Sequence, residues 1–174
     1  DRFPLAPSLA TPRILASSYG DTGVGKTRFA LTGPAPIVVF SLDDGTEGVV
    51  EEFRTEEDKE IRIVRIDWTA AEDESAEALQ ELAVTLRDQY ISDLRVALEH
   101  ARTVVVDKET DLWNMFRYAE FGTPKADVPR DFDKVNQLMR KYLQLPKKHG
   151  VNFFAIQGVR DNWVSQNKKD GTQK

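Results

Sequence analysis

The segment Gly20–Thr27 restricts the possible folds of this chain more than any other part of the sequence. It fits the pattern G-x-x-x-x-G-K-[ST] at each required position. Its glycines allow the backbone to curl so that successive N–H groups point into one concavity, which suits a phosphate. In this pattern the Lys26 ammonium reaches the β- and γ-phosphates and the Thr27 hydroxyl ligates Mg²⁺. The segment therefore predicts a site for ATP with Mg²⁺.

The sequence on either side of this loop supplies the context that the pattern requires. Residues 13–19 read as a short, mostly apolar strand, and residues 28–31 continue from the loop as a helix that Gly33 and Pro34 end. A glycine-rich turn that matches by chance is not expected to have both neighbours. The residues expected to bind the nucleotide are Gly20, Asp21, Thr22, Gly23, Val24, Gly25, Lys26, Thr27 and Arg28.

Strands and helices are expected to alternate along the rest of the chain. Apolar runs predict strands at residues 36–42, 61–68, 103–107 and 151–157, and the more alternating pattern of 61–68 favours an edge position. Helical spacing predicts helices at residues 49–53, 75–101, 112–121 and 131–149, the last kinked or shortened by Pro146. This alternation predicts an α/β fold, a mainly parallel sheet with helices on both faces. It does not give the strand order.

Length and composition indicate one globular domain at residues 13–174, preceded by a proline-containing extended arm at residues 1–12. Cysteine is absent, no apolar run reaches membrane-spanning length, and the first residues lack a secretion signal, so we expect a cytoplasmic protein that does not contact a membrane. His100 and His149 are each expected to end a helix rather than to bind a metal.

The net charge of −5 is unevenly distributed. Residues 140–174 carry +6, from eight Lys or Arg against two Asp, which leaves −11 on residues 1–139. A basic end on an acidic body suits a local contact with a polyanion, and an ordinary solvated surface is the alternative.

Polar residues follow several of the predicted strands, at ends that a parallel sheet places on one edge. Asp107 fits the acid that holds Mg²⁺ or its water shell, and an acid capping the next helix is the alternative. Asp44 is the better candidate for the base that orients the attacking water, with Asp43 and Glu47 as rivals, or else the turn is merely solvated. Gln157 either senses the γ-phosphate or is a polar strand end.

Four parts of the sequence resemble RecA-like ATPases, and within them a compact phage-encoded group of single-strand annealing or recombination ATPases. They are residues 19–27, residues 39–48, residues 104–107 with 110–116, and residues 152–157 with 160–163. The resemblance covers most of the chain from Arg13 onward. In RecA-like recombinases a Phe-x-x-Ala element docks on the neighbouring subunit, and Phe3 and Ala6 have that spacing, with a plain packed arm as the alternative.

The resemblance implies roles for several residues. It places the catalytic acid at Asp44, the γ-phosphate sensor at Gln157, and a loop that contacts single-stranded DNA at residues 158–174. The residues implied to bind DNA are Arg160, Lys168 and Lys169. It also implies a homo-oligomer, a ring or a filament, with ATP between subunits, a single-strand-binding protein as a further partner, and a bacterial host cell as the location.

The chain departs from the family pattern in three respects. Asp44 is shorter than the usual catalytic acid, which favours slow hydrolysis. Lys108 replaces the small or hydroxyl residue that usually follows the acid expected to hold Mg²⁺ (the Walker B acid), here Asp107. Family members also continue with further strands after the sensor, so a fragment is one interpretation of the sequence.

The leading hypothesis is therefore an Mg²⁺-dependent ATPase that binds single-stranded DNA and acts as a homo-oligomer in recombination or strand annealing. A helicase-type motor or loader, a small-molecule kinase and a nucleotide-gated binding module with little turnover are the alternatives.

Overall fold

Five parallel strands form one sheet in the computed structural model, which describes residues 13–42, 45–68, 75–122 and 129–158. The strands are β1 (Leu15–Tyr19), β2 (Ile37–Ser41), β3 (Ile61–Arg65), β4 (Thr103–Asp107) and β5 (Asn152–Gln157). Their spatial order is β1-β5-β4-β2-β3, and every neighbouring pair is parallel. The predicted parallel α/β architecture is thus confirmed. The strand pattern also placed residues 61–68 near an edge, and β3 does lie at one.

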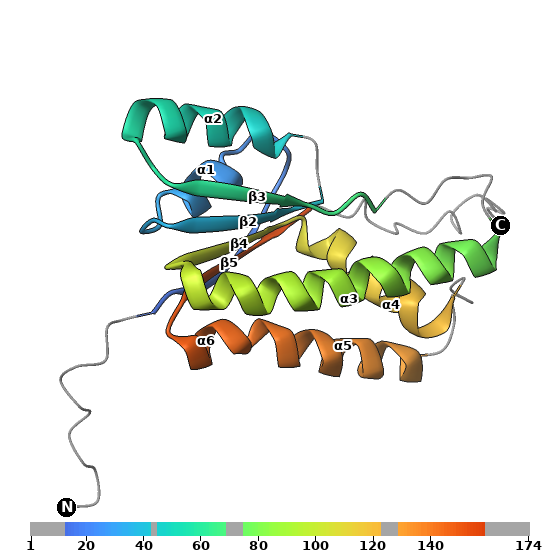
Figure 1. Cartoon of the computed structure of the whole chain (residues 1–174). Coiled ribbons are helices and arrows are strands. Elements are labelled where there is room, and N and C mark those ends of the chain that lie inside the picture. The colour runs from blue at the N-terminus through green and yellow to red at the C-terminus, as the bar shows by residue number, and fades with distance from the viewer. Residues whose placement is uncertain (1–12, 43–44, 69–74, 123–128, 159–174) are drawn as a thin grey trace, which may run out of the picture.

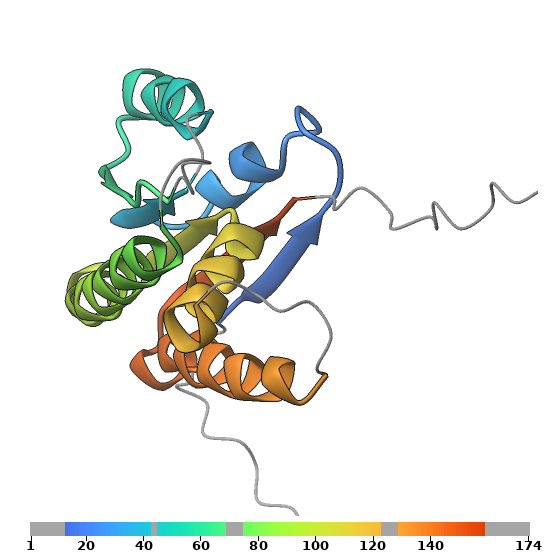
Figure 2. The same cartoon turned by 90° about the vertical axis from the view of Figure 1, so that its right-hand side faces the viewer.

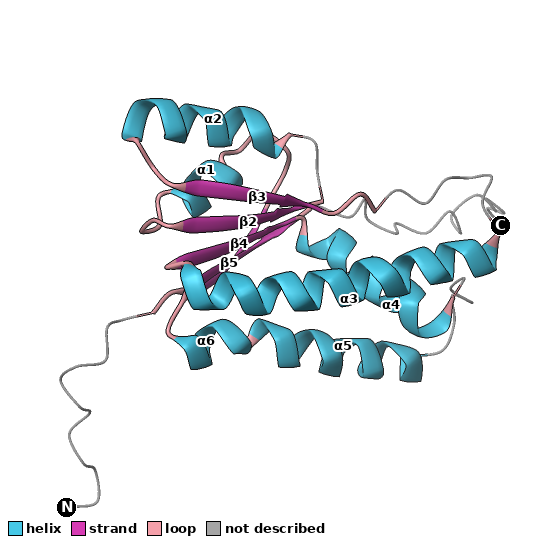
Figure 3. Ribbon diagram, in the orientation of Figure 1, coloured by secondary structure: helices cyan, strands magenta, loops and turns pink. Residues whose placement is uncertain are grey.

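Helices cover both faces of the sheet and make three layers (Figure 1, Figure 3). The two helices α1 (Lys26–Leu31) and α2 (Thr46–Glu57) lie on one face. The other face carries α3 (Ala76–His100), α4 (Glu109–Phe121), α5 (Pro129–Leu143) and α6 (Leu145–His149). Seen from the end, β1 and β5 lie side by side at the edge of the sheet opposite β3 (Figure 2).

The layers arise because the central strands are apolar on both faces. All residues of β2 and β4 are buried, as continuous runs of Val, Ile and Phe predict for strands covered on two sides. Alternate residues of β4 pack into different cores: Val104 and Val106 against α3 and α4, and Val105 against α1 and α2. The two helical layers therefore hold the central strands from both faces.

Three of the predicted helices differ in extent from the observed ones. The helix predicted at residues 112–121 is α4, which begins earlier, at Glu109. The helix predicted at residues 49–53 is α2, which has twelve residues from Thr46 to Glu57. The helix predicted at residues 131–149 is divided into α5 and α6, with Pro146 in the first turn of α6, which confirms the expected break. His100 and His149 are the last residues of α3 and α6, as expected for cations at helix C-termini.

The strand register aligns the carboxyl ends of the strands at one edge of the sheet. Ser41 pairs with Asp107, Asp107 pairs with Ile156, and Gln157 pairs with Tyr19, after which the phosphate-binding loop begins. The predicted convergence of strand ends is confirmed for these residues. Predictions for residues 1–12, for Asp43 and Asp44, and for residues 159–174 fall outside the described part of the chain. Within that part, no helix is long and apolar enough to cross a membrane.

Candidate nucleotide-binding site

The loop between β1 and α1 has a backbone that depends on glycine. Gly23 and Gly25 have φ angles of 85° and 86°, in the left-handed region that other residues rarely adopt. Gly25 is also the N-cap residue of α1, so the first amides of the helix follow it directly. The sequence thus forces the chain to turn sharply at the top of the sheet, with backbone N–H groups at the turn available to an anion.

The Lys26 side chain folds back onto its own loop. Its ammonium donates hydrogen bonds to the carbonyl oxygens of Gly20 and Asp21, both at 2.7 Å. Lys26 also lines the cavity beside the loop. The side chain therefore braces the turn while its charge stays close to the place where the sequence pattern predicts phosphate.

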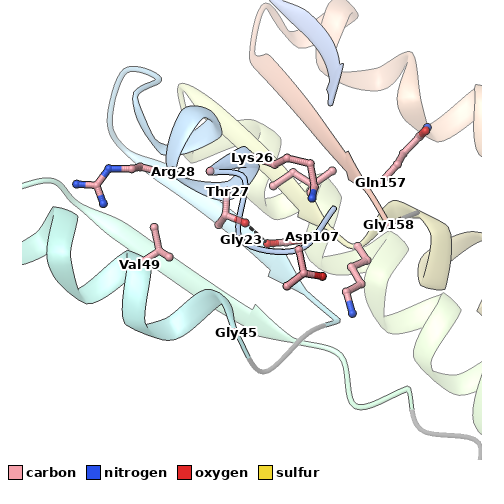
Figure 4. A pocket seen from close by; sticks show the side chains of 13 residues that line it. Gly23, Lys26, Thr27, Arg28, Gly45, Val49, Asp107, Gln157 and Gly158 are labelled. Carbon is pink, nitrogen blue, oxygen red and sulfur yellow. Dashed lines mark hydrogen bonds between the residues drawn. The ribbon is translucent and has the colours of Figure 1, made fainter. Parts of the chain in front are cut away.

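Thr27 and Asp107 meet at the centre of the site although 80 residues separate them in the sequence. The Thr27 hydroxyl donates to Oδ2 of Asp107 at 2.7 Å, and in Figure 4 the two side chains point toward each other. Asp107 is 5% exposed, because it ends a strand that is buried between two helical layers. The structure thus brings together the hydroxyl and the carboxylate that the sequence pattern assigned to a metal.

Two further hydroxyl groups, which the sequence analysis did not single out, are connected to the Asp107 carboxylate. Thr46 donates to Oδ2 of Asp107 at 3.2 Å and accepts from the hydroxyl of Ser41 at 3.0 Å. Both residues are buried. No local signal in the sequence marks them, because their contacts depend on the register that sets Ser41 opposite Asp107 and on α2 beginning with Thr46 just beyond β2. The carboxylate is therefore oriented by hydroxyls from α1 and α2.

Lys26, Thr27 and Asp107 border a cavity of about 370 Å³, large enough for a nucleotide's phosphates. The phosphate-binding loop and α1 form one wall, with Thr22, Gly23, Gly25, Lys26, Thr27 and Arg28. The rest of the lining comes from the ends of β4 and β5 and the first part of α2, with Asp107, Lys108, Ile156, Gln157, Gly158, Gly45 and Val49. Loop residue Val24 is 63% exposed and does not line the cavity.

The remaining predicted residues have different orientations. Gln157 lines the cavity, but its amide extends away from Lys26 and Asp107 (Figure 4), so that a change of rotamer is needed for it to reach a nucleotide there. Glu47, a rival for the catalytic base, is exposed and pairs with Arg65 of β3. Asp44, Arg160, Lys168 and Lys169 lie outside the described residues.

The Arg28 guanidinium points away from the cavity in Figure 4 and pairs through both terminal nitrogens with Glu52 of α2. It also lies over the ring of Phe53, 5.7 Å from the ring centroid. The hydrogen bond from Arg28 lowers the pKa of the Glu52 carboxyl below its ordinary value. Arg28 thus joins α1 to α2 through its guanidinium. Only the part of the residue before the guanidinium contributes to the cavity wall.

A parallel sheet of RecA-like type, a glycine-rich loop between β1 and α1, and a buried acid at the end of β4 together define a P-loop ATPase domain. The sequence profile of a family described as AAA domain matches residues 14–174, and the chain belongs to this family.

Comparison with solved structures found similarity to a prototypical ATPase from the type III secretion system of pathogenic bacteria. The sequence identity is 20% and the TM-score 0.41, over 82% of this chain and 43% of that one. The chain therefore spans less than half the length of that ATPase. No curated protein sequence matches this chain.

Proposed function

We propose that this domain binds ATP and hydrolyses it with the help of Mg²⁺. The observation that carries the proposal is the contact between Thr27 and Asp107 beside Lys26, which joins the two halves of a phosphate-transfer site across 80 residues. A cavity lined by glycine backbone, a lysine and a carboxylate suits a bound phosphate chain with its cation.

The residues of the site fit a magnesium ion. Mg²⁺ is commonly held by one or two carboxylates together with substrate phosphates and water, and Asp107 with the Thr27 hydroxyl offers oxygen ligands of this kind. When bound, the ion neutralises charge on the phosphates. Donation to Asp107 leaves lone pairs on the Thr27 oxygen, so this hydrogen bond is compatible with metal ligation. Thr46 and Ser41 fix the direction of the carboxylate.

The chain's own groups would divide the remaining work. Backbone N–H groups of the loop bind the phosphates, and Lys26 offsets the charge on the terminal phosphate. We assign the orientation of the attacking water to Asp44, because the next residue, Gly45, lines the cavity. We assign γ-phosphate sensing to Gln157, on the strand end beside Gly158.

We further propose that the domain binds single-stranded DNA and acts as a homo-oligomer in recombination or strand annealing. The resemblance to recombination ATPases and the basic residues after Gly158 support this part. Half of the cations counted in residues 140–174 belong instead to α5 and α6, so only the other half lies in the segment after Gly158. A nucleotide-gated binding module with little turnover is the second candidate, favoured by the orientation of Gln157.

ATPase activity measured with and without single-stranded DNA tests the proposal. We expect Mg²⁺-dependent phosphate release that single-stranded DNA stimulates. Hydrolysis that DNA leaves unchanged would contradict the DNA-dependent part alone. ATP binding without measurable release would favour the binding module, and absence of ATP binding would contradict the proposal as a whole.

A further inference from the structure

Lys108 occupies a place in the cavity that the roles above do not use. It follows Asp107 at the end of β4 and lines the cavity together with Gln157 and Gly158 at the end of the neighbouring strand, β5. Its Cδ atom lies 4.0 Å from the position that a Cβ on Gly158 would take. Part of the lysine side chain therefore lies beside Gly158, just after the end of β5.

The local helix gives no reason for a lysine at this position. Lys108 is the N-cap residue of the thirteen-residue helix α4, and its side chain forms no capping hydrogen bond. An ammonium group only donates hydrogen bonds, whereas an N-cap side chain must accept one from the first turn. A cation also lies unfavourably at the positive end of a helix dipole. A residue that violates a local rule in this way points to a role in the site.

The charges around the cavity indicate what that role is. Lys26 is held on the β1 side by carbonyl oxygens of its own loop, and Lys108 enters from the β4 side. Among the described residues that line the cavity, Asp107 is the only acid. The two lysines therefore line one cavity, Lys26 from the start of α1 and Lys108 from the end of β4, an arrangement that suits an anion with more charge than one lysine balances.

We propose that Lys108 binds the terminal phosphate of ATP, so that one chain supplies two lysines to the site. The inference rests on the proposed ATP-binding function and extends it to the selection of triphosphate over diphosphate. ADP lacks the phosphate that Lys108 contacts, and its affinity does not depend on this side chain. The contact matters most without Mg²⁺, when no metal ion shares the charge of the phosphates.

The test compares affinities for ATP and for ADP, measured by displacement of a fluorescent ADP analogue, first in EDTA and then in Mg²⁺. We expect Lys108→Ser to reduce the preference for ATP over ADP by roughly tenfold or more in EDTA, with ADP affinity unchanged. Lys108→Arg should retain most of the preference because it keeps the charge. Lys148→Ser, at an exposed lysine on α6, is the matched control and should behave as the wild type.

Thermal unfolding separates this role from a structural one. Serine is a good N-cap residue, so Lys108→Ser should leave Tm unchanged or raise it by about 2–4 °C while ATP selection is lost. An unchanged ATP to ADP ratio in Lys108→Ser, with normal ATP binding by the wild type, would overturn the inference and leave the proposed function intact. Equal loss of ATP and ADP affinity would also overturn it, because the lysine would then act on the site as a whole.

Discussion

Thr46 and Asp107 are joined by a hydrogen bond of 3.2 Å between the first residue of α2 and the last residue of β4, although 61 residues separate them. Both side chains are buried, at 3% and 5% exposure. Because Oδ2 of Asp107 also accepts from Thr27, one carboxylate oxygen connects α1, α2 and the central strand of the sheet. A change at Thr46 should therefore reach the candidate metal site without touching the nucleotide.

Replacing Thr46 with Val preserves the shape of the side chain and removes its hydroxyl. The hydrogen bond to Asp107 is lost and the Ser41 hydroxyl loses its acceptor, so we expect a loss of about 1–3 kcal/mol in the free energy of unfolding. The Mg²⁺ concentration for half-maximal ATPase activity should rise about tenfold, as for other residues that orient a metal ligand. Thr85→Val, which removes an exposed hydroxyl from α3, should change neither chemical denaturation nor the Mg²⁺ titration.

Gly25 and Gly48 allow the effect of backbone strain to be measured where an added Cβ has open space at both positions. A Cβ added at either position meets nothing within 4 Å, but only Gly25 has a left-handed φ. Gly25→Ala should therefore lower the free energy of unfolding by about 1–2 kcal/mol and distort the phosphate-binding loop. Gly48→Ala, inside helix α2, should raise it by about 0.5–1 kcal/mol. Denaturant unfolding and ATP binding measure both effects, and equal behaviour of the two variants would contradict this account.

The site could be predicted from the sequence wherever one local pattern determines both structure and chemistry. The loop Gly20–Thr27 was predicted because its glycines, lysine and threonine are each required at a fixed spacing. Asp107 was predicted because it ends an apolar run, and the end of a buried strand lies at the edge where ligands bind. The edge position of β3 followed from its alternating pattern in the same way.

Features that depend on the tertiary arrangement were not predictable. Ser41 and Thr46 are ordinary hydroxyl residues until the register places β2 beside β4 and α2 above both. The insertion of β5 between β1 and β4 has no local signal, because all three are short apolar runs. The length of α2 was underestimated, since most of its residues are polar and exposed and a short apolar segment, Val49–Phe53, carries the visible periodicity.

Lys26→Ala tests the phosphate-binding loop directly. The charge that offsets the phosphates is removed, so we expect ATPase activity to fall by about 10²–10³-fold. The two hydrogen bonds to loop carbonyls are also lost, but they lie at the surface or are only partly buried, so Tm should change little. Lys141→Ala, on the exposed end of α5, is the control. Normal hydrolysis by Lys26→Ala would show that the nucleotide site is elsewhere.

The Arg28–Glu52 pair, which joins α1 to α2, should make the stability of the protein depend on pH. Arg28 lowers the pKa of Glu52 in the folded protein from its ordinary value of 4.5, so the stabilising contribution of the pair is present above that value. It is lost as the pH falls through the lowered pKa, because Glu52 then becomes protonated. In Arg28→Ala the Glu52 pKa should rise toward 4.5, as measured by NMR titration of the carboxyl carbon. Arg62→Ala, which removes the partner of Glu60, should leave the Glu52 titration unchanged.

The basic residues near the C-terminal end of the sequence include two sets of three with different expected effects on DNA binding. Arg160, Lys168 and Lys169 follow Gly158, whereas Arg140, Lys147 and Lys148 precede β5, on α5 and α6. Replacing the first set with Gln should weaken binding to single-stranded DNA and lower the salt dependence of log K by about 2, because three phosphate contacts are lost. The second triple variant carries the same change in net charge, so it controls for a general electrostatic effect and should bind nearly as the wild type. Fluorescence anisotropy over a series of salt concentrations measures both, and equal losses in the two triples would mean that DNA responds to the charge of the whole domain rather than to the segment after Gly158.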